Sequence, residues 1–412
     1  MSGTATRLKE GAKLGYVKHL DGLRAVSIAA VMIVHMANSK RLGKGGWIGV
    51  DVFFVLSGFL ITVLLLEDAR RAPNGRPSLS RFYLRRAFRL MPALFAFLGL
   101  ALLFGAIYRS SVYGTWAHDL FMGATYRMNF YSIGHQALQG TSQTWTLCME
   151  EQFYLVWPVA LILLSAVLRP RAIMTIVGVG VAASLGINVL LYMHHVDFRR
   201  LYYAPDTNAG SLLLGCLAGL AFHAGYLQRL AGMRLSRWFP AAFLVLLGGW
   251  TLLVGNTDRI VYAGPTTVFC LLAALAIACL LVEPGSVAGR FLAWAPMVWI
   301  GRLSYSLYLW NDLLFKVAPK IGPGSVGAFG KALVALVLTF GAATASYYLV
   351  EQPFIKLKKR IDQSLANRQP DATPGGPVAS GLTDGSRRAL GEGMTGGEVV
   401  SAASVIGSSG RA

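Results

Sequence analysis

The chain has 412 residues, of which 55% are hydrophobic and only 14% are charged. An average soluble domain has about 45–50% apolar and about 25% charged residues, so this composition excludes a soluble globular domain, a coiled coil and a disordered chain. The net charge of +19 is compatible with nucleic-acid binding, but the 38 Lys and Arg lie in short segments between long apolar runs. That arrangement is typical of a protein that crosses the lipid bilayer several times, and it excludes nucleic acid as a partner.

Apolar runs of about 20 residues, the length that a helix needs to cross a bilayer, recur ten times along the chain. They lie near residues 21–38, 47–66, 90–108, 147–168, 172–193, 207–224, 239–255, 264–282, 298–316 and 329–350. The sequence therefore predicts an all-α fold, a polytopic transmembrane helix bundle of about ten spans. Most Lys and Arg fall in the even-numbered gaps and at the termini, which predicts that both termini are cytoplasmic.

The two ends of the chain differ in composition from the apolar runs. Residues 1–15 are polar and basic and form a predicted cytoplasmic N-terminal segment. Residues 365–412 are rich in Gly, Ser, Ala, Pro and Thr and hold no apolar run long enough for a core. This composition predicts a disordered cytoplasmic tail.

The first predicted span carries Arg24 and His35 among its ionisable residues. Eleven residues of helix bring both side chains to nearly the same face, ~16 Å apart along the axis. Ionisable residues inside a span are candidates for function, because they are expensive to place in lipid. A structural explanation is also open, in which Arg24 reaches the interface and His35 bonds to a neighbouring helix.

Before the third span, one helical turn gathers Arg85, Arg86 and Arg89. Spacings of three and four residues place these guanidinium groups on one side of a helix. Guanidinium groups bind phosphates in a forked geometry, so the trio is a candidate phosphate site. The alternative is that they are basic anchors of the kind that cytoplasmic loops carry.

The fourth span opens with adjacent carboxylates, Glu150 and Glu151. Adjacent helical residues point about 100° apart, so only one can reach the outer interface easily. Glu150 shares a stripe with Tyr154 and Trp157, which predicts that it faces the interior while Glu151 reaches the outer headgroups. Near the outer end of the second span, Asp51 is a further candidate, although an acidic residue at a helix N-terminus explains it as well.

Several motifs of soluble enzymes are absent from the sequence. The chain has no His followed five residues later by Asp, no phosphate-binding P-loop, no G-x-S-x-G and no H-E-x-x-H. Its four cysteines lie in apolar stretches without a C-x-x-C pair. No metal site is predicted.

Six stretches resemble the acyltransferase-3 family of integral membrane O-acyltransferases, which modify bacterial polysaccharides, O-antigens, nodulation factors and macrolides. The matching stretches are Leu20-Asp21-Gly22-Leu23-Arg24-Ala25 followed by His35, Gly49 to Phe54 with Ser57-Gly58-Phe59, Arg85 to Pro92, Trp145 to Tyr154, Ser304 to Trp310, and Glu351-Gln352-Pro353-Phe354. The resemblance covers about residues 16–356 and implies ten transmembrane helices, an acyl-CoA donor on the cytoplasmic side and His35 as the catalytic residue. Two positions depart from the family pattern, where Asn208 replaces a common Arg and Asn311 a usual His.

The resemblance and the polar residues together give a hypothesis for the site. An imidazole suits a general base at neutral pH, and a carboxylate that orients it would stabilise the imidazolium. The predicted catalytic residues are His35 and Glu150; the predicted donor-binding residues are Arg24, Arg85, Arg86 and Arg89; the predicted acceptor-binding residues are Asp51, Ser57, Tyr154 and Trp145.

The predicted donor is acyl-CoA, with acetyl-CoA the simplest case, and the predicted acceptor is a hydroxyl of a glycan or a glycosylated small molecule. The predicted location is the plasma (bacterial inner) membrane. Two other functions remain open from the sequence: a transporter with a buried Arg, His and Glu path, and an inactive family member that acts as a binding protein.

Overall fold

The computed structural model describes residues 14–36, 43–73, 75–107, 116–135, 141–255, 259–321 and 327–367. Contacts divide the chain into two compact units, Met1–Asp362 and Gln363–Ala412, and the description below concerns the first. Nearly all of the predicted N-terminal segment 1–15 and of the predicted disordered tail 365–412 lies outside the described residues.

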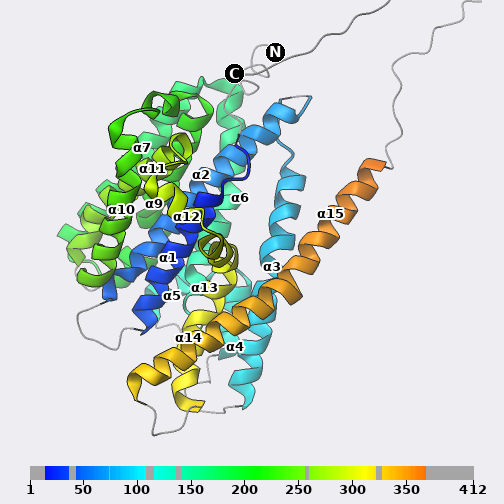
Figure 1. The fold of residues 1–412 in the computed structure, drawn as a ribbon, viewed down its shortest axis with the longest axis vertical. Coiled ribbons are helices and arrows are strands. Elements are labelled where there is room, and N and C mark those ends of the chain that lie inside the picture. The colour runs from blue at the N-terminus through cyan, green and yellow to red at the C-terminus, as the bar shows by residue number, and fades with distance from the viewer. Residues whose placement is uncertain are drawn as a thin grey trace, which may run out of the picture. The chain divides into compact units, whose positions relative to one another are not determined.

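Each predicted span is a helix, and the described residues contain no strand. The helices at the ten predicted spans are α1 (Lys18–Met36), α2 (Ile48–Arg71), α3 (Leu79–Ile107), α6 (Thr144–Val167), α7 (Pro170–Met193), α9 (Pro205–His223), α10 (Arg234–Leu253), α11 (Pro265–Val282), α13 (Ala295–Ile321) and α14 (Ala328–Ala345). A π-helical turn, η5 (Ser346–Glu351), joins α14 to α15 (Gln352–Asn367). The all-helical prediction is confirmed (Figure 1).

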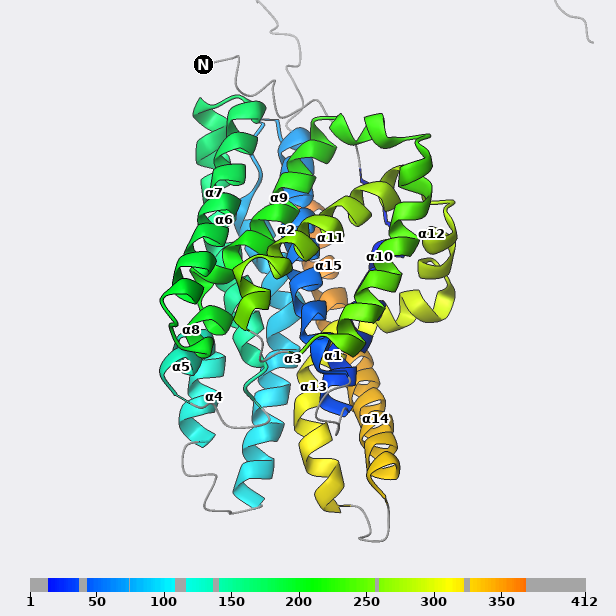
Figure 2. The same cartoon turned by 90° about the vertical axis from the view of Figure 1, so that its left-hand side faces the viewer.

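Shorter elements connect the long helices. They are η1 (Lys44–Trp47), α4 (Trp116–Ala124), α5 (Met128–Gly134), α8 (Phe198–Tyr203), η3 (Tyr226–Leu230), η4 (Arg259–Ala263) and α12 (Val287–Leu292). Figure 2 shows α4 and α5 beside the lower part of the bundle, where α4 contacts α3 and α5 contacts α6.

Eight helices in the described part are long and apolar enough to cross a membrane. The predicted spans at 207–224 and 298–316 are also helices, α9 of 19 residues and α13 of 27, but neither is among the eight. Polar residues interrupt the apolar sequence of both helices. Both pack against other long helices: α9 packs against α2 and α7, and α13 packs against α1 and α14. Interior positions of this kind are where a membrane protein can hold polar side chains.

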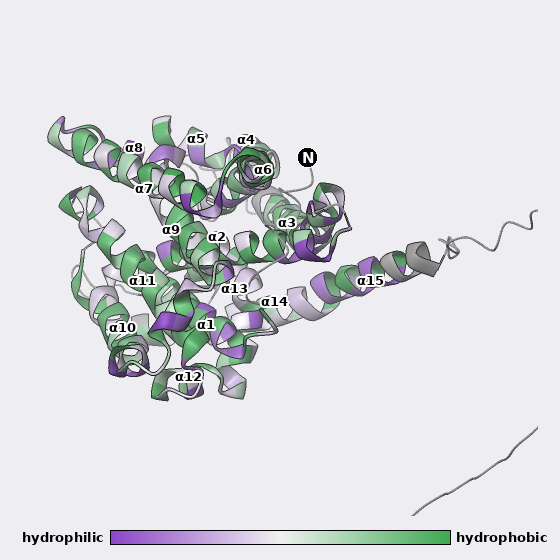
Figure 3. Cartoon of the chain, turned by 90° about the horizontal axis from the view of Figure 1, so that it is seen from above, coloured by the Kyte–Doolittle hydropathy of each residue, from purple (hydrophilic) through white to green (hydrophobic). Residues whose placement is uncertain are grey.

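Exposed apolar side chains mark the surface that faces lipid. Large hydrophobic residues are exposed along α7, α10 and α14, among them Val179, Val245 and Val337. In a soluble protein such an exposed apolar surface would promote aggregation. In a bilayer the lipid chains around it are apolar too, so the surface is compatible with its surroundings. Figure 3 shows the hydrophobic colour along α7 and α10, while α15 carries both hydrophilic and hydrophobic residues.

Glycines allow two pairs of helices to cross with their backbones in contact. A Cβ at Gly58 would overlap the carbonyl oxygen of Leu212, and one at Gly215 would overlap that of Val55, so α2 and α9 need glycine at both positions. On α13, Gly301 meets the backbone of Asp21 of α1 in the same way. Small residues at such crossings are the usual means of close helix packing in membranes.

The contacts also fix the helix directions. The glycine contacts and the contact of His35 with Asp312 show that α1 runs parallel to α13 and that α2 runs parallel to α9. The helices α3 and α6 run antiparallel, since Tyr83 bonds to Leu155 and Arg86 bonds to Glu151. This alternation agrees with ten successive crossings. The bundle has a Lys18 end, where α1 begins, α2 ends and α3 begins, and a Met36 end, where α1 ends and α2, α9 and α11 begin.

Candidate active site

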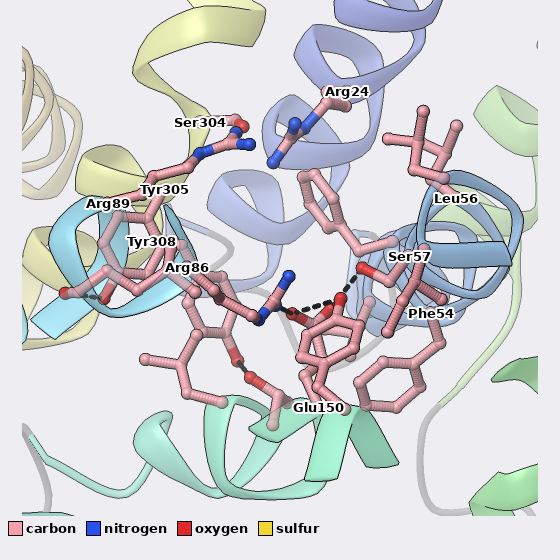
Figure 4. Close-up of a pocket in the computed structure, with 18 of the residues that line it drawn as sticks. Arg24, Phe54, Leu56, Ser57, Arg86, Arg89, Glu150, Ser304, Tyr305 and Tyr308 are labelled. Atoms are coloured by element: carbon pink, nitrogen blue, oxygen red, sulfur yellow. Dashed lines mark hydrogen bonds and ion pairs between the residues drawn. The ribbon is translucent and has the colours of Figure 1, made fainter. Parts of the chain in front are cut away.

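Five helices, α1, α2, α3, α6 and α13, line a partly open pocket that we call the arginine pocket (Figure 4); its empty space is about 920 Å³, including the part open to solvent. Six of the ten residues predicted for the site line it: Arg24, Ser57, Arg86, Arg89, Glu150 and Tyr154. These residues are far apart in the sequence, so the helix packing alone brings them together. Leucine and phenylalanine side chains of α2 and α3 supply much of the remaining wall.

Arg86 is held by three side chains of α6. Its Nε donates to Oε1 of Glu151 at 2.9 Å, its Nη2 lies 3.8 Å from Oε2 of Glu150, and its guanidinium carbon lies 3.0 Å from the centre of the Tyr154 ring. The prediction that Glu151 reaches the outer headgroups is therefore wrong. Its carboxylate turns inward because it is a counter-ion of Arg86.

Glu150 also faces the pocket, as the stripe with Tyr154 predicts. Its Oε1 accepts a hydrogen bond from Ser57 at 2.8 Å, and its Oε2 accepts one from the Tyr154 hydroxyl at 3.4 Å. These contacts tie α2 to α6 across the pocket. The contacts of Glu150 do not include His35, which is predicted from the sequence to be the partner of this carboxylate.

The two other arginines of the pocket, Arg24 and Arg89, form no ion pair within the described residues. Figure 4 shows their guanidinium groups on the same side of the pocket as Ser304. Ser304 is only 2% exposed and its hydroxyl has no hydrogen-bond partner among the described residues. Two guanidinium groups without a close ion pair, on which Glu351 acts only as a more distant counter-charge, lie beside an unpaired hydroxyl and form a site suited to an anion such as a phosphate.

Arg85 does not line the arginine pocket. Its side chain is 43% exposed, and Nη2 lies 4.0 Å from Oδ1 of Asp68. Of the predicted trio on α3, the pair spaced three residues apart, Arg86 and Arg89, faces the pocket. The structure gives Arg85 no place in that site.

The carboxylate that contacts His35 belongs to Asp312 of α13. Nδ1 of His35 lies 3.3 Å from Oδ1 of Asp312, whose side chain is 2% exposed. Ser142 donates to Oδ2 at 3.3 Å, and Lys316 forms an ion pair with the same carboxylate. The sequence analysis missed Asp312, although an acidic residue inside a predicted span, next to the departure at Asn311, was a usable signal.

Asp51 and Trp145 line a second, narrower pocket at the Met36 end, which we call the Asp51 pocket. Oδ1 of Asp51 accepts a hydrogen bond from Ser211 of α9 at 3.0 Å. The predicted acceptor residues are thus divided, with Ser57 and Tyr154 in the arginine pocket.

The stretch 142–146 contacts all three sites: the His35–Asp312 pair, the Asp51 pocket and the arginine pocket. Ser142 bonds to Asp312, Trp145 lines the Asp51 pocket, and Thr146 lines the arginine pocket. Val50 and Phe54 of α2 line both pockets. The described residues contain no group of three or more His, Cys, Asp or Glu side chains arranged to hold a metal ion.

Comparisons with known proteins identify the family of this chain. A family model described as an acyltransferase domain matches residues 17–350. The chain is similar to the O-acetyltransferase OatA of Staphylococcus aureus, with 29% identity over 364 residues that cover 85% of this chain and 59% of that protein. It is also similar to the peptidoglycan O-acetyltransferase OatA of Listeria monocytogenes, with 29% identity over 357 residues that cover 83% and 56% of the two chains.

The chain therefore spans less than two thirds of the length of these relatives. No solved structure matches it significantly. Because the family model extends over most of the chain, from Val17 just before α1 to Val350 within η5, this protein belongs to the acyltransferase-3 family.

Proposed function

We propose that this protein is a membrane-embedded O-acyltransferase that moves an acyl group, acetyl in the simplest case, from cytoplasmic acyl-CoA to a hydroxyl of a carbohydrate. The observation that carries the proposal is the pair of unpaired guanidinium groups, Arg24 and Arg89, beside the unpaired hydroxyl of Ser304. The relatives are named for O-acetyl transfer, and one of them for peptidoglycan as its acceptor.

The donor would bind with its phosphates at Arg24 and Arg89. Coenzyme A carries its thioester at the far end of a flexible arm, and the ~16 Å along α1 from Arg24 to His35 suits such an arm. The positive charge at the Lys18 end supports a cytoplasmic donor site in the bacterial inner membrane. The acceptor would then approach from the Met36 end.

His35 would act as the general base. With Nδ1 held by Asp312, Nε2 removes the proton from the acceptor hydroxyl while the hydroxyl oxygen attacks the thioester carbonyl. The carbon–sulfur bond then breaks, and the proton passes to the departing CoA thiolate. Asp312 fixes the ring orientation and stabilises the imidazolium that forms during transfer.

For Glu150 the observed contacts favour a role in shaping the donor pocket around Arg86 over the predicted orientation of His35. Glu150 and Glu151 together offset the charge of Arg86, which leaves Arg24 and Arg89 for the donor phosphates.

The decisive experiment is acetyl transfer by the purified protein in liposomes, with acetyl-CoA as the donor and tri-N-acetylchitotriose as the acceptor. We expect release of free CoA together with an acetylated sugar. Release of neither product contradicts the proposal, and movement of a solute without CoA release identifies a transporter.

A matched pair of variants tests the donor site. Arg89→Ala removes an unpaired pocket cation, whereas Arg85→Ala removes an exposed cation of the same helix that lies outside the pocket. We expect a raised KM for acetyl-CoA in Arg89→Ala alone, with the difference from wild type shrinking at high salt because phosphate attraction is screened. Equal donor KM values for both variants and wild type would contradict the assignment.

A further inference from the structure

The Asp51 pocket is walled by aromatic and polar side chains at the Met36 end of the bundle. The residues that line it include Trp47, Asp51, Trp145, Tyr202, Tyr262 and Thr266. Trp47 and Tyr262 stack with their ring centres 5.0 Å apart, and Trp145 lies 4.8 Å from Tyr202. Flat aromatic faces of this kind can pack against the C–H face of a sugar ring.

Two hydrogen-bond donors in this wall are buried and unpaired. Trp47 is 5% exposed and Tyr262 is 7% exposed, yet neither the Trp47 Nε1 nor the Tyr262 hydroxyl has a partner among the described residues. Buried polar groups without partners are rare, because leaving them unbonded destabilises the fold. A water molecule or a polar group of a ligand can therefore bond to them.

The chemistry of the wall identifies that group. The indole N–H of Trp47 can only donate, and the Asp51 carboxylate, which makes no ion pair within the described part of the chain, can only accept when ionised. An anion would be repelled by ionised Asp51, and a cation could not accept the hydrogen bond that the Trp47 N–H offers. A neutral hydroxyl group can accept from Trp47 and donate to Asp51 at the same time.

We propose that the Asp51 pocket receives a hydroxyl-bearing part of a neutral sugar of the acceptor. The proposal rests on the proposed function in that the acceptor is taken to be a glycan. The position is suitable, because Val50 and Phe54 separate this pocket from the donor pocket and Trp145 is three residues from Ser142, which contacts Asp312. Three residues of the pocket wall are only partly buried: Tyr202, Asn208 and Thr266. The remainder of the sugar would contact these residues.

Tyr262→Phe tests the site with a single oxygen atom. The lost hydroxyl has no hydrogen-bond partner in the described part of the chain, so the thermal unfolding midpoint should not fall. The KM for tri-N-acetylchitotriose should rise about 3- to 10-fold, as expected for one lost neutral hydrogen bond, with the KM for acetyl-CoA unchanged. Asp51→Asn should raise the same acceptor KM.

The matched control is Tyr226→Phe, which removes a tyrosine hydroxyl that bonds to Arg171 and lies outside both pockets. It should leave the acceptor KM unchanged. Unchanged acceptor KM values in both Tyr262→Phe and Asp51→Asn would overturn the proposal, while the acetyl transfer itself would stand and the pocket would hold only water.

Direct binding separates this proposal from the proposed function. Calorimetric titration of tri-N-acetylchitotriose into the wild type and the Tyr262→Phe variant, both in nanodiscs without acetyl-CoA, needs no turnover. Weaker binding by the variant supports the sugar site even if no acetyl transfer is found. Equal affinities, including no binding by either protein, overturn it.

Discussion

At the scale of single residues, the contact between His35 and Asp312 is the feature on which the proposed chemistry depends. His35→Ala removes the base and should reduce acetyl transfer to a few per cent of wild type or less. Asp312→Asn keeps the side-chain size but removes the charge that stabilises the imidazolium, so kcat should fall on the order of 10²-fold. The KM for acetyl-CoA should change little, because Asp312 lies outside the arginine pocket.

Steady-state kinetics of both variants with acetyl-CoA and the oligosaccharide measure these values. A kcat of Asp312→Asn within about threefold of wild type would show that Asp312 is merely the counter-ion of Lys316.

Glu150 allows a second test at this scale. Its two possible roles, offsetting the charge of Arg86 or orienting His35, predict changes in different kinetic constants. Glu150→Gln can still accept the hydrogen bond from Ser57, so the fold is retained. If the carboxylate offsets Arg86, its loss makes the pocket more positive and lowers the KM for acetyl-CoA at low salt. If it instead orients His35, kcat falls on the order of 10²-fold at unchanged donor KM.

We expect the lowered donor KM, measured by initial rates at low and high salt. Glu151→Gln is the matched variant, since its carboxylate forms the shorter ion pair with Arg86, and it should shift the donor KM in the same direction.

At the scale of helices, the crossing of α2 and α9 holds both pockets in place, since Ser57 lies beside Gly58 and Ser211 lies one turn from Gly215. Gly215→Ala would push a methyl group into the backbone of Val55, and overpacking of this kind typically destabilises by about 1–3 kcal/mol. Thermal unfolding in detergent should show a lower midpoint.

Gly186→Ala on α7 is the matched control, because nothing lies within 4 Å of the added carbon. Alanine has the higher helix propensity, so this variant should be as stable as wild type or more stable. A Gly215→Ala midpoint equal to that of Gly186→Ala would mean that the two helices can move apart freely.

At the scale of the whole molecule, the donor site requires one orientation in the membrane. The four native cysteines are buried, so single introduced cysteines can be labelled selectively in intact cells. Ser80→Cys, near the start of α3 at the Lys18 end, should resist an impermeant maleimide until the membrane is opened. His194→Cys, just after α7 at the Met36 end, should react from outside, and the reverse pattern would place the arginine pocket away from cytoplasmic acyl-CoA.

The sequence by itself determined the long helices and the family. Runs of about 20 apolar residues predicted all ten long helices, because a bilayer demands that length and forces the backbone to bond within each segment. The polar residues inside those runs, Arg24, His35 and Glu150 among them, stood out because lipid penalises them. Helical spacing also predicted that Glu150 faces inward.

Only the tertiary structure decided which of these residues meet. Periodicity places a side chain on a face of its own helix but does not say which helix that face touches, so it could not choose Asp312 over Glu150 as the partner of His35. In the same way it could not show that Arg85 lies outside the arginine pocket, or that Asp51 and Ser57 line different pockets. The glycine crossings of α1 with α13 and of α2 with α9 make those choices, because the close approach of two backbones fixes the depth and rotation at which each helix presents its polar residues.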